Sequence, residues 1–130
     1  MSSRKRKVVV AEGAPKAIGP YSVAIRTEGL IFVSGTIGVD PATGEFVAGG
    51  VESQTRQVLK NLGEVLKAGD SSLGQVVKTT VFMQDMSEFA LMNAVYAEFF
   101  QDESPARSTV EVAALPKGAA VEIEAIALVD

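Results

Sequence analysis

Residues 51–83 read VESQTRQVLKNLGEVLKAGDSSLGQVVKTTVFM, and the period of their hydrophobic pattern changes partway along. Over residues 51–68 the apolar side chains recur at three- and four-residue spacing, which predicts an amphipathic helix. Gly69 stands where a helix C-cap is expected. Residues 76–83 are β-branched and apolar, as in a buried strand. A helix of this length between two strands suggests a right-handed crossover.

The chain on both sides of this stretch continues the alternation of strands and helices. A second helix is predicted over residues 89–99, after a start at Asp85 and Glu88 that resembles a capping box. Strands are expected at residues 7–11, 22–26, 30–34, 76–83, 107–112 and 121–129. The predicted order is β-β-β-α-β-α-β-β. It indicates an α+β domain with one mixed sheet and two helices on one face.

The other face of the predicted sheet also carries many apolar residues, which indicates an oligomer. Residues 1–7 are expected to be a flexible basic arm, and residues 8–130 the domain. No apolar run approaches the roughly 20 residues that a membrane-spanning helix needs, so we expect no membrane association. A cytoplasmic location is expected, or a mitochondrial one if the source is eukaryotic.

Composition excludes many kinds of catalysis. The chain has 130 residues, with no cysteine and no histidine, so it has no thiol nucleophile, no disulfide and no Ser-His-Asp arrangement. Zinc sites built from sulfur or imidazole are excluded for the same reason, and no metal is expected. The formal net charge is −4 although four basic residues cluster at positions 4–7. The rest of the chain is therefore strongly acidic, which disfavours nucleic-acid binding on electrostatic grounds.

Arg107 and Glu122 are the candidate catalytic residues. Arg107 follows Ser-Pro-Ala at the start of a predicted strand, where its planar guanidinium is suited to gripping a carboxylate. A surface ion pair is the alternative. Glu122 and Glu124 share one face of the last strand. A partly buried carboxylate there can move protons for a bound water, whereas a solvated strand end or an ion pair is the plainer interpretation.

Tyr21, Ser34, Gly35, Thr36 and Asn93 are candidates for binding. Tyr21 follows a proline-stiffened segment and can line a pocket or simply pack. Gly35 interrupts a strand between two hydroxyl residues, which allows close approach of a ligand or marks a β-bulge without one. Asn93 lies away from the apolar stripe of the second helix, in a polar pocket or facing solvent.

These residues fall in stretches that resemble the RidA/YjgF family. The C-terminal signature comprises PARSTVEVAALPKG (105–118) and VEIEAIA (121–127). Three further stretches follow the family pattern in order: APKAIGPYS (14–22), VSGTI (33–37) and VKTTVF (77–82), with Asn93 after them. The resemblance covers the chain from about residue 8 onward.

The resemblance implies a chorismate-mutase-like fold, assembled as a homotrimer with sites between subunits. It implies hydrolysis of 2-aminoacrylate and related imines to 2-keto acids and ammonia, without a cofactor. In this family Arg107 would hold the substrate carboxylate, and Glu122 would activate water or carry a proton to the departing nitrogen. The residues implied to contact substrate are Tyr21, Ser34, Gly35, Thr36, Asn93 and Thr109.

Three departures from the family pattern affect substrate preference, and two other functions stay open. Val23 and Thr36 stand where relatives often have glutamine, and Thr109 where many have cysteine. One alternative is a translation-inhibiting endoribonuclease, against which the acidic body and missing histidine argue. The other is a non-catalytic, chaperone-like trimer that binds small carboxylates through Arg107.

Overall fold

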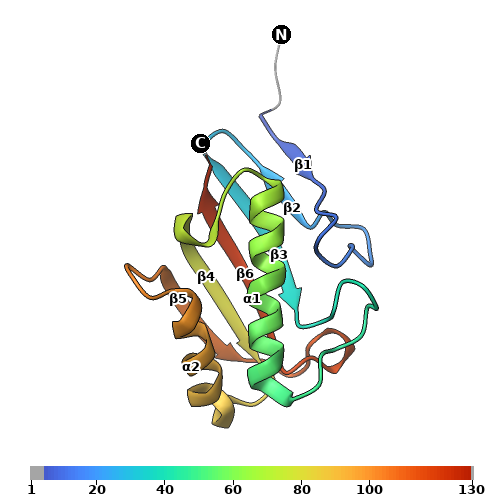
Figure 1. Cartoon of the computed structure of the whole chain (residues 1–130), viewed down its shortest axis with the longest axis vertical. Helices are drawn as coiled ribbons and strands as arrows, with labels where there is room; N and C mark the ends of the chain where they lie inside the picture. The colour runs from blue at the N-terminus through green and yellow to red at the C-terminus, as the bar shows by residue number, and fades with distance from the viewer. Residues whose placement is uncertain (1–4, 130) are drawn as a thin grey trace.

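The structure is a computed structural model that describes residues 5–129; Arg4, part of the expected basic arm, lies outside them. Both helices lie on the same face of a single six-stranded sheet (Figure 1). The helices are α1 (Gly50–Ala68) and α2 (Phe89–Phe99). The strands are β1 (Lys7–Val9), β2 (Ala24–Arg26), β3 (Leu30–Ile37), β4 (Val76–Met83), β5 (Ala106–Glu111) and β6 (Val121–Leu128). The predicted α+β class and element order are confirmed.

The strand order in the sheet is β1-β2-β3-β6-β4-β5. β6, the last strand, lies between β3 and β4 and runs antiparallel to both, whereas β4 and β5 are parallel neighbours joined through α2. Because β3 and β4 flank one strand, α1 carries the chain across β6. The predicted strand–helix–strand unit is therefore confirmed, with a non-consecutive strand inserted in its middle.

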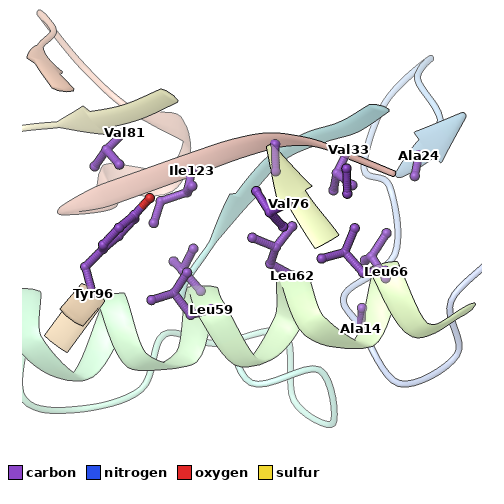
Figure 2. Close-up of a cluster of buried hydrophobic side chains, with 14 of the residues drawn as sticks. Ala14, Ala24, Val33, Leu59, Leu62, Leu66, Val76, Val81, Tyr96 and Ile123 are labelled. Carbon is purple, nitrogen blue, oxygen red and sulfur yellow. The ribbon is translucent and has the colours of Figure 1, made fainter. Parts of the chain in front are cut away.

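The apolar stripe of α1 builds the core. Leu59, Leu62 and Leu66 are fully buried, and they point at the sheet beside Val33 and Ile123 (Figure 2). At the end of the helix, the amide of Gly69 donates hydrogen bonds to the carbonyls of the last turn, as a C-cap should. A Cβ at Gly69 would collide with the Ile31 side chain, so glycine also allows α1 to approach β3 closely.

The opposite face of the sheet has no helix over it. Side chains alternate along β6, so that Val121 and Ile123 are buried while Glu124 and Leu128 are exposed on the other side. The large apolar side chains Phe32, Val110 and Leu128 are between 42% and 47% exposed. The register places all three on this uncovered face, which we call the open face.

Strand boundaries differ from prediction near the N-terminus. β1 ends at Val9 and not at residue 11, since the chain turns at residues 12–14. β2 begins at Ala24 and not at residue 22. β3 extends through Ile37, with a shift in pairing register between Val33 and Thr36. This irregularity is a β-bulge, which was one of the two interpretations of Gly35 in the sequence.

Asn61 on α1 ties the end of β3 to the helix. Its side chain is 1% exposed, and its amide nitrogen donates to the carbonyls of Ile37 (3.2 Å) and Val39 (2.9 Å). Its amide oxygen accepts a 2.9 Å hydrogen bond from Gln57. The Ile37 carbonyl also accepts a 3.0 Å hydrogen bond from the Val39 amide. Burial of the Val39 carbonyl without a donor would be costly, so Asn61 holds the chain in place where it leaves the sheet.

Asn61→Ala should lower the free energy of unfolding by about 2 kcal/mol, because the Val39 carbonyl loses its donor and the Ile37 carbonyl keeps only the Val39 amide. Urea denaturation followed by circular dichroism measures this. Lys60→Ala, a change at the exposed neighbouring position, should cost less than about 0.5 kcal/mol. Equal effects of the two substitutions would contradict the role given to Asn61.

Candidate active site

Arg107 lies on an aromatic platform formed by α2. Its guanidinium carbon is 4.7 Å from the ring centroid of Tyr96 and 5.6 Å from that of Phe89. Tyr96 is itself buried, and its hydroxyl is 2.8 Å from that of Thr79 on β4. Cation–π contact of this kind orients a guanidinium while leaving most of its N–H groups available.

Asn93 lies on α2 with the aromatic platform, and Thr109 lies on β5 with Arg107. Phe89, Asn93 and Tyr96 are spaced so that they share one face of α2. Thr109 follows Arg107 by two residues, so both point to the same side of β5. The Thr109 hydroxyl is buried and has no hydrogen-bond partner among the described residues. We call Arg107, Asn93 and Thr109 the arginine half-site.

A second group of predicted residues lines a cavity of about 410 Å³ at the other end of the sheet. Beyond Val33, β3 has no pairing with β2, and the irregular segment before β2 runs along this free edge. The cavity lies between that segment and the chain that follows β3. Its lining includes four of the predicted residues: Tyr21, Ser34, Gly35 and Thr36.

The hydroxyls in this cavity are engaged within the chain. The Ser34 hydroxyl donates to the Ser22 carbonyl (2.7 Å), and that of Thr36 donates to the Ser34 carbonyl (3.1 Å). The Tyr21 hydroxyl accepts a 3.4 Å hydrogen bond from the Ile18 amide. These bonds fix the shape of the cavity wall, so a ligand would meet a preformed surface.

Glu122 does not itself line the cavity, but its carboxylate lies beside Gly35, which does. A Cβ added at Gly35 would be 2.5 Å from the carboxylate oxygen Oε2 of Glu122, so a side chain at this point of the bulge would displace the Glu122 carboxylate. Burial raises the pKa of Glu122 above its ordinary value, and the charge of Glu124 raises it further. The shift brings the carboxyl group closer to exchanging protons near neutral pH. We call Glu122 and the cavity the glutamate half-site.

The two half-sites do not meet within one chain. Arg107 pairs with Thr79, which faces the helices, whereas Glu122 pairs with Phe82 on the open face. The two residues are separated by two strand spacings and three positions along the strands, roughly 10 Å in each direction. Opposite faces and this separation rule out the alternative of an ion pair between them. None of the ion pairs among residues 5–129 involves either residue.

Tyr96, Phe89 and Thr79 are the neighbours of Arg107 that sequence reasoning missed. Both aromatic residues belong to the apolar stripe predicted for the second helix, and Tyr96 is indeed buried. Helical spacing places Phe89, Asn93 and Tyr96 on one face, so the expectation that Asn93 lies away from the stripe was wrong for these two neighbours, and this spacing was the available signal. Nothing in the local pattern indicated that Arg107 would lie over that face.

In the part of the chain that the structure describes, no helix is long and apolar enough to cross a membrane. Within the same residues, no group of three or more acidic side chains is arranged to hold a metal ion.

Comparison with known proteins gives consistent matches over nearly the whole chain. Residues 11–129 match the family model described as Endoribonuclease L-PSP. The chain is 53% identical over 97% of its length to Reactive Intermediate Deaminase A, chloroplastic, of Arabidopsis thaliana, of which it covers 67%. It is 51% identical over 98% of its length to 2-iminobutanoate/2-iminopropanoate deaminase of Mus musculus, of which it covers 95%.

Solved structures show the same fold. The crystal structure of E. coli TdcF with bound serine matches with a TM-score of 0.91 at 42% identity, covering 95% of this chain and 99% of that one. The predicted chorismate-mutase-like fold is thereby confirmed.

The raised pKa of Glu122 predicts a pH-dependent effect of Glu122→Gln on stability. The folded state disfavours the charged carboxylate, so the wild-type chain loses stability as pH rises from the ordinary value of 4.5 through the raised pKa. Glu122→Gln should therefore raise Tm at pH 7.5, with the gain disappearing towards pH 4.5. Calorimetry at both pH values measures this. Glu45→Gln, in an exposed turn, is the control; a gain for Glu122→Gln that does not vary with pH would contradict the assignment.

Proposed function

Because this chain belongs to the Endoribonuclease L-PSP family, which includes the RidA-type deaminases matched above, we propose that it hydrolyses imines of 2-keto acids with Arg107 and Glu122. The substrates are 2-aminoacrylate and related enamines, after tautomerisation to the imine, and the products are a 2-keto acid and ammonia. Relatives that are about 50% identical over nearly the full length of this chain carry a deaminase activity in their names. The observation that supports the residue roles is that one chain carries both a guanidinium on an aromatic platform and a carboxyl of raised pKa.

The reaction requires few catalytic groups. Water adds to the C=N carbon, forming a C–O bond, while the nitrogen gains a proton, which gives a carbinolamine. The hydroxyl proton then moves to the nitrogen, the C–N bond breaks as the oxygen forms the C=O of the keto acid, and ammonia leaves. Glu122 accepts a proton from the attacking water and returns one to the departing nitrogen, so the carboxyl ends as it began. Imines hydrolyse readily, and orientation plus one acid–base group suffices. No step calls for a histidine, a thiol or a cofactor.

Arg107 supplies the orientation. All the proposed substrates carry a carboxylate next to the reacting carbon, and a guanidinium fork binds a carboxylate through two parallel hydrogen bonds. Asn93 and Thr109 border this position, and the unpartnered Thr109 hydroxyl is available to a ligand oxygen or nitrogen. Tyr21 and residues 34–36 shape the cavity for the rest of the molecule.

The two half-sites become one site in a homotrimer. A substrate small enough to touch one guanidinium cannot reach the carboxyl on the other sheet face of the same chain, so Arg107 of one protomer must face Glu122 of its neighbour. Exposed Phe32 and Leu128 give the open face an apolar surface suited to burial between copies. The family resemblance implies that this assembly is a trimer. One kind of interface, repeated three times around a ring, is enough to close it.

Removing Arg107 should slow catalysis strongly. With 2-aminoacrylate generated by a serine dehydratase and escaping imine trapped by semicarbazide, the wild-type protein should lower the trapped fraction. Arg107→Ala should reduce kcat/KM roughly 100-fold, because two charge-assisted hydrogen bonds to the carboxylate are lost. Arg56→Ala removes a surface ion pair with Glu98 and should leave the rate unchanged. A wild-type protein that matches the blank with several imines would refute the deaminase.

The shared site predicts complementation between two inactive variants. Arg107→Ala and Glu122→Gln, unfolded together and refolded as mixed assemblies, should regain activity at about a quarter of the interfaces, because only those combine an intact arginine with an intact glutamate. Light scattering gives the oligomeric state, and native mass spectrometry verifies mixing. Mixed trimers without recovered activity would contradict a site between protomers.

A further inference from the structure

We propose that Tyr96, anchored by Thr79, is a positioning residue that sets Arg107 in the orientation needed to receive the substrate carboxylate. The proposal rests on the function assigned to Arg107 above and adds residues that do not themselves touch the substrate. It follows from the contacts among three side chains on three different elements, β4, α2 and β5.

The sheet register brings the three side chains together. Thr79 and Arg107 are direct partners in the β4–β5 pairing, so they lie side by side on the helix-facing side of the sheet. Tyr96 reaches down from α2 and meets both. Its hydroxyl is 2.8 Å from the Thr79 hydroxyl, while its ring lies 4.7 Å beneath the Arg107 guanidinium. Figure 2 shows the Tyr96 side chain extending from α2 with its hydroxyl oxygen directed at the strands.

The arrangement solves a problem specific to a carboxylate-binding arginine. An arginine side chain has many rotamers, and a flexible guanidinium must be immobilised when the ligand binds. A salt bridge would immobilise it but would occupy the N–H groups that the substrate needs. An aromatic ring restrains the guanidinium plane through its face, so the edge of the fork stays available.

Core packing alone does not account for the two hydroxyls. Tyr96 is 5% exposed and Thr79 is fully buried, one of three buried polar side chains among the described residues. A buried hydroxyl pair contributes little more to stability than an apolar pair of the same shape. Burial raises the pKa of Tyr96 and outweighs the opposing effect of the nearby Arg107 charge, so the phenol stays protonated. Tyr96 can therefore donate to Thr79 while its ring face contacts Arg107.

The first test measures the Kd of 2-oxobutanoate, a keto-acid product, by calorimetry on the full chain, together with the KM and kcat for imine hydrolysis. Tyr96→Leu should raise Kd and KM roughly tenfold, because the platform is lost, while kcat changes less than about twofold. If Tyr96 had a purely structural role, its loss would lower the apparent kcat in proportion to the fraction of folded protein and leave KM unchanged. Leu66→Ala, at a fully buried core position away from Arg107, is the control and should lower the apparent kcat without changing KM.

Substitutions of the hydroxyl pair isolate the hydrogen bond while the ring remains. Tyr96→Phe, Thr79→Val and the double variant should each raise KM by the same factor, roughly threefold, since all three remove one interaction. Thr79→Ser keeps the hydroxyl and should restore the wild-type KM. Additive effects in the double variant, or a KM for Thr79→Ser equal to that for Thr79→Val, would overturn the anchoring role of Thr79.

The decisive comparison is made in the Arg107→Ala background. If Tyr96 acts through Arg107, Tyr96→Leu should cause no further change in the Kd of 2-oxobutanoate there. A Tyr96→Leu effect of equal size in both backgrounds would overturn the proposal. Binding that is lost in Arg107→Ala but intact in all Tyr96 variants would overturn this proposal alone. Wild-type binding in Arg107→Ala would overturn it together with the role of Arg107 in the proposed function.

Discussion

Alternation of side chains across the sheet is the constraint on which the rest of the molecule depends. The period of two that buries Val121 and Ile123 beneath the helices turns Glu122 to the opposite face. The same rule on β5 points Arg107 at α2. Shifting either strand by one residue would exchange the faces and would also bury charge in the core. Core packing thus holds the two reactive side chains in place, although neither belongs to the core.

In the proposed mechanism, this separation leaves the single chain without a complete site. Each protomer presents a guanidinium at one edge and a carboxyl beside a cavity of about 410 Å³ at another. In the proposed assembly the open face supplies the association energy, and association brings the two groups together. Oligomerisation and catalysis would then depend on the same apolar side chains, Phe32 and Leu128 among them. An isolated protomer would retain the fold without a working site.

Both reactive groups are tuned by their immediate neighbours. Arg107 is held by aromatic faces, which orient it and leave its donors open. Glu122 is tuned by partial burial against Gly35 and by the nearby Glu124, and both effects favour the protonated carboxyl. The first arrangement favours binding of an anion, and the second favours proton exchange near neutral pH. In the proposed mechanism, a chain without histidine thereby obtains its acid–base group from a glutamate.

The sequence by itself determined the elements and their order, because these are encoded locally, and it indicated the candidate residues through the family resemblance. The three- and four-residue spacing of α1, the β-branched run of β4 and the turn residues between them need no distant partner to be recognised. Tertiary structure alone decided that β6 lies between β3 and β4, that Arg107 and Glu122 occupy opposite faces, and that Tyr96 lies under Arg107. Those facts depend on pairing between segments far apart in the chain, such as Thr79 with Arg107, and no local pattern specifies which strands will pair or which helix will cover them.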